Sequence, residues 1–190
     1  MKGTLGMSLE KFLTESRATV LKRWFDAVVD AYPPETTRLL KKEKNQFANP
    51  VGHSLSQGME GIYDELAGGL VPEKVQPHLD KIIRIRAIQD FSPSQAVAFI
   101  FLLKKIFRDV LGDARTDEGI SPQELLALET QIDSLALLAF NIYMECREKL
   151  CEVRIAEIKN RSFRLLQRAN LLTEIPEHES EFEKGSTPIT

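Results

Sequence analysis

The longest uninterrupted helical stretch of the sequence constrains its fold more than any other feature. From Pro122 to about Leu172 the chain contains no glycine and no further proline. A helix of about fifty residues reaches about 75 Å at 1.5 Å per residue, whereas a domain of this size is about 30 Å across. The second half of this helix is therefore expected to project from the domain or to pair with another segment.

Two helix starts are defined by capping boxes. Ser92 and Ser121 are each followed by a proline, and by Gln or Glu three residues after the serine. Serine at the N-cap, proline at the first helical position and Gln or Glu at the third pre-organise the first turn of a helix. Helices are therefore expected to begin at Pro93 and Pro122.

Helical periodicity covers most of the remaining chain. Apolar residues recur at helical spacing behind Ser8, which is a good N-cap, until Pro33 stops the pattern. Pro50 and Gly52 disfavour a helix through QFANPVGH, so a loop is expected there, followed by a helix from about His53. The expected helices of this part of the chain cover residues 9–31, 35–42, 53–67 and 72–89.

The segment behind Ser92 is apolar on every side. It reads AVAFIFLL over residues 96–103, and a helix that is apolar all round is typically surrounded by other helices. This helix is therefore expected to be the central element. Strand signals are nearly absent, because no Asn-Gly turn occurs and the brief alternation at 82–86 lies inside a helical segment. The sequence predicts an all-α fold, a multi-helix bundle with a long C-terminal helix.

The chain is expected to have three parts. Residues 1–150 form the helical bundle, residues 151–172 continue the last helix, and residues 173–190 form an acidic tail. The tail carries five Glu and few apolar residues, so it cannot bury enough surface to offset its ordering entropy. The sequence predicts that this tail is disordered.

Composition bounds the cellular setting. The 190 residues are 43% hydrophobic and carry a net charge of −3, which suits a globular protein with a core and gives no global attraction to nucleic acid or anionic membranes. The N-terminus lacks the apolar region of a signal peptide, and the apolar run 96–103 is far shorter than the roughly 20 residues that span a bilayer. A cytoplasmic protein without membrane insertion is expected.

Recognisable catalytic and metal-binding patterns are missing from the sequence. His53, His78 and His178 have no second His, Cys or paired carboxylate at helical ligand spacing. Cys146 and Cys151 point about 140° apart on one helix, so they are expected to be reduced thiols. Ser-His-Asp sets, GlyXGlyXXGly and GKS or GKT motifs are also absent. We therefore expect no enzyme activity, no metal and no cofactor; His78 is the one candidate for a haem ligand and is better explained as a surface histidine.

Three residues are candidates for ligand binding. His53 lies where a helix begins, beside Asn49, and the free amides of a helix N-terminus suit an anion; a structural cap between loop and helix is the alternative. Arg86 precedes Asp90 by four residues and lies just before the Ser92 cap. It is expected either to pair with a carboxylate and fix a corner between two helices, or to belong to a binding site.

The most specific interaction signal is a row of residues in the second half of the long helix, here called the seam. Its members follow alternating steps of four and three, which is typical of a coiled coil. Seven basic residues between Arg147 and Arg168 face only three Glu, and this favours the solvated side of a coiled coil over a phosphate contact. A homodimer is expected, with parallel and antiparallel pairing both open. The seam consists of Cys151, Ile155, Ile158, Ser162, Leu165, Ala169 and Leu172.

Three segments together carry a family resemblance: FANPVGHSL, IIRIRAIQDFSPSQAVAFIFLLKKIF and AFNIYMECREKL. Over roughly residues 9–150 the chain resembles the N-terminal domain of the RsbRD type, found in RsbT co-antagonist proteins of the bacterial stressosome and ahead of some sensor kinases. The resemblance implies a helical input module that dimerises and passes a signal along its last helix, with a relation to non-haem globin-like domains left open. After Leu172 only the acidic tail follows, so a stand-alone domain is expected.

These features favour a bacterial signalling or regulatory domain. It is expected to act by protein–protein interaction or by sensing an unknown signal, without catalysis, and to have an unidentified regulatory protein as partner besides a second copy of itself. The alternative is a small-molecule or cofactor carrier with a globin-like pocket. Visible absorbance of the purified protein separates the two.

Overall fold

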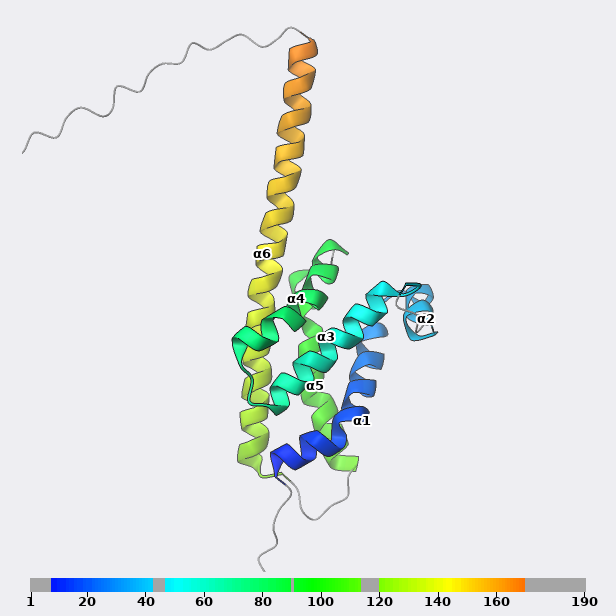
Figure 1. The fold of residues 1–190 in the computed structure, drawn as a ribbon, viewed down its shortest axis with the longest axis vertical. Coiled ribbons are helices and arrows are strands. Elements are labelled where there is room, and N and C mark those ends of the chain that lie inside the picture. Colours follow the sequence, from blue (N-terminus) through cyan, green and yellow to red (C-terminus); the bar gives the residue numbers. More distant parts are fainter. Residues whose placement is uncertain (1–7, 43–46, 90, 114–119, 170–190) are drawn as a thin grey trace, which may run out of the picture. The chain divides into compact units, whose positions relative to one another are not determined.

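The computed structural model describes residues 8–42, 47–89, 91–113 and 120–169 (Figure 1). In these ranges the chain forms six helices and no strand, which confirms the all-α fold class. The chain divides into two units, Met1–Lys149 and Leu150–Thr190. The expected tail and Leu172 lie outside the described residues. The helices are α1 (Leu9–Val29), α2 (Pro34–Lys42), α3 (Pro50–Ala67), α4 (Pro72–Ile88), α5 (Pro93–Asp113) and α6 (Pro122–Arg168).

Both capping boxes form as expected. The Ser92 amide donates to Gln95 Oε1 (3.0 Å) and the Gln95 amide donates to Ser92 Oγ (3.4 Å). Ser121 and Glu124 make the same reciprocal pair at 3.0 and 3.2 Å. Glu124 also accepts from the Leu9 amide (3.4 Å), so one carboxylate links the starts of α6 and α1.

Helix α3 begins at Pro50, three residues earlier than expected. The prediction of a loop up to His53 was wrong, because proline is favourable at the first position of a helix when the residue before it is a good cap. Asn49 is that cap: its Oδ1 accepts from the Gly52 amide (2.9 Å). Its Nδ2 donates to the Leu40 carbonyl (3.2 Å), so Asn49 joins the start of α3 to α2.

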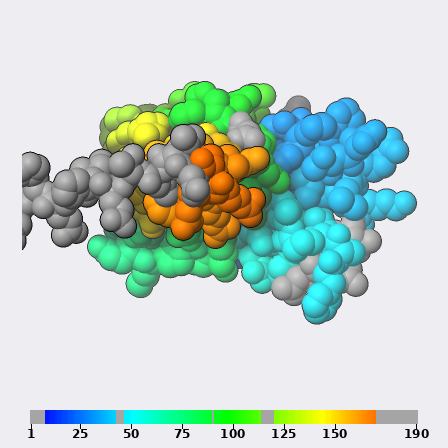
Figure 2. All heavy atoms as spheres, turned by 90° about the horizontal axis from the view of Figure 1, so that it is seen from above, coloured from blue at the N-terminus to red at the C-terminus, as the bar shows by residue number. Residues whose placement is uncertain are grey.

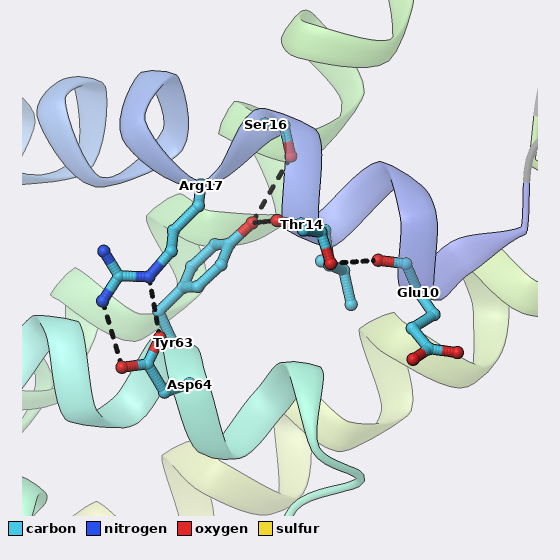
Figure 3. Close-up of polar contacts among 7 residues, drawn as sticks. Glu10, Thr14, Ser16, Arg17, Tyr63 and Asp64 are labelled. Atoms are coloured by element: carbon cyan, nitrogen blue, oxygen red, sulfur yellow. Dashed lines mark hydrogen bonds and ion pairs between the residues drawn. The ribbon is translucent and has the colours of Figure 1, made fainter.

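The first unit is held by one large apolar core. Helices α1, α3, α4, α5 and α6 all contribute to it. Within it Trp24 stacks on Phe99 with 5.9 Å between the ring centroids, and the indole nitrogen donates to the Phe99 carbonyl (2.7 Å). The hydroxyl of Tyr63 on α3 donates to the Leu13 carbonyl on α1 (2.7 Å; Figure 3). These bonds satisfy the polar ends of large aromatic residues that are otherwise buried.

A second, smaller cluster lies where α2 meets α1 and α3. Its buried members are Val29, Tyr32 and Leu40. Figure 1 shows α2, light blue, beside the C-terminal end of α1 and the N-terminal end of α3, and Figure 2 shows the same blue and cyan segments adjoining. Three partly buried residues pack against this second cluster and connect it to the rest of the bundle: Phe25, Val51 and Phe91.

Helix α5 is not surrounded on every side, so that expectation was wrong. One face is buried in the core, but Phe101 is 48% exposed. The α5 helix packs against α1 and α4, and these neighbours cover only part of its surface. Its continuous apolar run therefore reflects a buried face together with a second, exposed apolar position.

Helices α3 and α4 form the closest helix pair, and two glycines of α3 permit it. A Cβ atom at Gly58 would lie 2.8 Å from Ile82 Cγ1 and 3.0 Å from the His78 carbonyl oxygen. At Gly61 it would lie 2.1 Å from Nδ1 of His78. His78 was expected to be a surface residue, but its ring lies over Gly61, because the missing side chain leaves room for it.

Helix α6 contributes differently to the two units. Residues 122–149 bury Leu128, Ile132, Leu135 and Ala139 in the core. Every residue from 151 to 169 is exposed. By length and composition α6 is also the one helix of the described ranges that could cross a membrane, although only 33% of its most apolar window is buried. It therefore carries more apolar residues than the core uses.

Candidate functional site

Arg86 is the one charged side chain among the described residues that is buried, with 2% of its surface exposed. It lies in the last turn of α4. Its Nη1 donates to the carbonyl of Gln95 in the first turn of α5 (3.0 Å). Nε and Nη2 have no hydrogen-bond partner among the described residues. Asp90, the expected carboxylate partner, lies outside the described residues, so that pairing stays a prediction.

Three aromatic rings surround the guanidinium of Arg86. Its central carbon lies 4.9 Å from the ring centroid of Phe99, 5.0 Å from that of Phe91 and 5.9 Å from that of Tyr32. Ring faces attract cations, more strongly where water is excluded. Burial lowers the pKa of Arg86, and the nearby Tyr32 hydroxyl opposes the shift; burial raises the pKa of Tyr32, and Arg86 opposes that shift. The geometry gives no hydrogen bond from Nε or Nη2 to this hydroxyl. A guanidinium keeps its proton even so, so this is a buried cation in an aromatic cage.

The corner between α4 and α5 is also bonded to α6. The Tyr143 hydroxyl donates to the carbonyl of Phe91, and Arg147 Nη1 donates to the carbonyl of Ala87 (3.2 Å). Both acceptors lie within five residues of Arg86 along the chain. A change of conformation at this corner would therefore act directly on α6.

A second arginine shows what a paired guanidinium looks like in this protein. Arg17 on α1 donates from Nε to Asp64 Oδ1 (2.8 Å) and from Nη2 to Oδ2 (3.0 Å; Figure 3). This bond raises the pKa of Arg17. The two donors used here, Nε and Nη2, are the same two atoms that lack a partner in Arg86.

The structure brings Asn49 and His53 together at a pocket of about 310 Å³. The side chain of Asn49 is engaged in capping, and the His53 amide donates to the Asn49 carbonyl (3.1 Å). These first-turn groups stabilise the helix start, and the role of Asn49 and His53 in ligand binding stays a prediction. The pocket is lined by Phe25, Leu40, Lys41, Asn49, Gly52, His53 and Ser56.

Arg86 does not line this pocket. Phe25 and Leu40 line it, and the same two residues pack in the cluster that contains Tyr32 and Phe91. The pocket and the guanidinium thus contact members of the same cluster. The sequence did not predict this pocket, because its lining comes from three different helices, α1, α2 and α3.

The seam residues of the second unit are all exposed as far as Ala169, and Leu172 lies outside the described residues. Sequence reasoning missed a second exposed row within the first unit, formed by Leu137, Phe140 and Met144. These three follow steps of three and four, and Met144 precedes Cys151 by one heptad. The spacing alone could have identified this row, but the sequence does not show which apolar face of a helix is buried.

The metal-binding chemistry of the chain is sparse where the structure describes it. In those ranges no three His, Cys, Asp or Glu side chains gather in a way that could hold a metal ion. Cys146 and Cys151 are free thiols. His178 lies outside the described residues.

The fold places the chain among all-α helical bundles, with a last helix that carries exposed apolar residues. The comparison with known families gives the particular one. The model of the RsbT co-antagonist protein rsbRD N-terminal domain family matches residues 18–158, and the chain belongs to this family of signalling regulatory domains. No curated protein and no solved structure gives a significant match.

Proposed function

We propose that the chain is a bacterial signalling domain that acts without catalysis and transmits its signal by pairing of α6 with a second copy. The observation that carries this proposal is the apolar row on α6 that no described residue covers. Helices exposed on all sides are marginal in water when short. A partner helix would give the second half of α6 the burial that stabilises helices in proteins.

The size of the row suits a reversible dimer. Six large apolar residues of α6 are 38% to 69% exposed: Leu137, Phe140 and Met144 in the first unit, and the seam residues Ile155, Ile158 and Leu165 in the second. Full burial of such a side chain is worth about 1.5–3 kcal/mol, so completing it contributes about 1 kcal/mol each, or about 12 kcal/mol over two copies. The entropic cost of association is about 4–15 kcal/mol. These terms are comparable, as expected for a dimer that a signal can strengthen or weaken.

A second copy of the chain fits the apolar residues of α6 better than an unrelated, highly charged helix does, because its own α6 carries the same apolar residues. A two-fold pairing places the same apolar row on both sides, which is the commonest way for a chain to cover such a face. Basic residues flank the seam, so parallel in-register pairing brings like charges together. Antiparallel or splayed pairing relieves that repulsion. A regulatory protein partner would then bind the dimer.

Ile158→Asp tests the proposal, with Val153→Asp as its matched control. Both residues are β-branched, lie on α6 and are about equally exposed, 65% and 56%. Ile158 belongs to the seam, whereas Val153 lies on the opposite side of the helix. Sedimentation velocity at tens of micromolar should show a dimer for the wild-type chain and for Val153→Asp, and a monomer for Ile158→Asp. A monomeric wild-type protein, or equal effects of the two variants, would contradict the proposal.

A further inference from the structure

We propose that Arg86 anchors a binding site for a small monocarboxylate with an apolar body. The inference goes beyond the proposed function, because it needs only the first unit and does not depend on pairing of α6. It rests on the two unpartnered donors of a buried guanidinium, on the rings around it and on the absence of a described carboxylate within pairing distance.

The two free donors define the shape of the partner. Nε and Nη2 lie on one edge of the guanidinium plane with their N–H bonds nearly parallel, and this edge accepts a carboxylate through both of its oxygens. Arg17 shows the same edge occupied by Asp64 at 2.8 and 3.0 Å. Nη1 of Arg86 is already bonded to the Gln95 carbonyl, and this bond fixes the guanidinium so that the edge keeps its direction.

Burial makes an outside partner more favourable than none. Buried donors in proteins are almost always paired, and a buried cation without a counter-charge is costly. Arg86 is 2% exposed, so water contributes little to its solvation. A carboxylate that enters the site supplies both hydrogen bonds and the missing charge.

The walls of the site select the rest of the ligand. Phe91, Phe99 and Tyr32 are apolar or aromatic surfaces, which favour an apolar body. A single buried cation balances one negative charge, so a monoanion fits better than a phosphate dianion. Phe91 is the half-buried member of the three rings, whereas Tyr32 and Phe99 are buried, so a ligand reaches the guanidinium only if the Phe91 ring moves.

Occupation of this site would reach α6. Phe91 accepts the hydrogen bond from Tyr143, and Ala87 accepts the one from Arg147. Movement of the Phe91 ring for a ligand therefore changes a residue whose backbone is bonded to α6. The ligand would act as an input, and α6 would carry the response.

The experiment uses the full chain and four probes: benzoate, hexanoate, and their neutral amides benzamide and hexanamide. Thermal unfolding is followed together with the side-chain Nε–H resonance of Arg86 in a proton–nitrogen NMR spectrum, identified from its loss in Arg86→Lys. At about a hundred times Kd, a carboxylate should raise the unfolding midpoint by roughly 5–10 °C. It should shift the Arg86 resonance, whereas the amides should do neither.

Variants separate a site from a structural role. Arg86→Met should abolish the response to carboxylates while the protein without ligand stays at least as stable as wild type, since a buried unpaired charge is removed. Arg86→Lys keeps the charge but loses the two-donor edge, so its response should fall at least tenfold. Arg17→Met removes an exposed, already paired arginine and should change nothing in the binding.

Several results would overturn the site. The first is a lack of response to either carboxylate, and the second is an equal response in Arg86→Met. A response to inorganic phosphate alone would contradict the monocarboxylate class. If Asp90→Asn and Arg86→Met both lower the unfolding midpoint of the protein without ligand, the chain's own carboxylate is the partner of Arg86, and the proposed site is excluded. The Ile158→Asp variant should still bind the carboxylates, and this separates the test from the test of α6 pairing. If Arg86→Met does not fold, the shift of the Arg86 resonance in the wild-type protein decides whether the carboxylate binds there.

Discussion

Gly58→Ala should destabilise the bundle, although alanine is the better helix former. Gly58 lies within α3, where alanine gains about 1 kcal/mol over glycine. The added Cβ would come within 2.8 Å of Ile82 Cγ1 and 3.0 Å of the His78 carbonyl oxygen. The oxygen belongs to the backbone of α4 and cannot rotate away, so the two helices must separate.

The size of the effect follows from these two opposing terms. Overpacking of a well-packed contact costs about 1–3 kcal/mol, and a backbone contact places Gly58 at the upper end of that range. After the gain in helix propensity, the free energy of unfolding should fall by about 1–2 kcal/mol. For a chain of this size the midpoint should fall by roughly 2–8 °C.

Gly112→Ala is the matched control, because a Cβ at Gly112 meets nothing within 4 Å. It should leave stability unchanged or raise it by up to about 1 kcal/mol. Gly61→Ala should fall between the two, because the atom it would displace belongs to the rotatable ring of His78. Urea unfolding followed by far-UV circular dichroism measures all three. A Gly58→Ala protein as stable as the Gly112→Ala protein would refute the close-packing argument.

Four further outcomes are expected. Truncation after Leu150 should leave a folded helical protein whose dimer is weaker by light scattering; an unchanged dimer would place the interface in the row from Leu137 to Met144 instead. Ser121→Ala should lower the free energy of unfolding by about 0.5–2 kcal/mol, and an unchanged urea midpoint would mean that the capping box contributes nothing. The hydrogen bonds from Ser121 hold the pKa of Glu124 below its ordinary value of 4.5. The stabilisation they give is therefore complete above pH 4.5 and is lost as the pH falls through the folded pKa. Glu124→Gln should flatten this acid dependence of the free energy of unfolding, and an identical slope would exclude the carboxylate as its source. The purified protein should show no Soret band and no stoichiometric zinc, and one mole of metal per chain that is lost on replacing His53 or His78 would contradict this.

Local signals predicted the helices of this protein well. The capping boxes at Ser92 and Ser121 are short-range patterns, and both form as the sequence indicates. The predicted start of α3 was wrong because proline breaks a helix only inside it. Asn49 caps α3, so Pro50 lies at the first helical position, where proline is favourable. Helix starts thus depend on a cap that the proline rule alone does not include.

The surroundings of Arg86 could not be predicted from its neighbours in the sequence. Its rings come from the connection between α1 and α2, the α4–α5 corner and the first half of α5. Such a cage depends on how helices distant in the sequence pack. The exposed residues Leu137 and Phe140 on α6 are a different case: their spacing is visible in the sequence, but sequence alone does not say which of two apolar faces a helix buries.

Hydrogen exchange along α6, measured as a function of protein concentration, tests the central claim most directly. Residues 151–169 are exposed in a single chain, so their amides should exchange quickly when the chain is monomeric. Pairing of α6 should slow exchange in this segment as concentration rises through the dimer dissociation constant, while Leu128 and Ile132 in the core stay protected throughout. Fast exchange over 151–169 at every concentration would contradict pairing of α6.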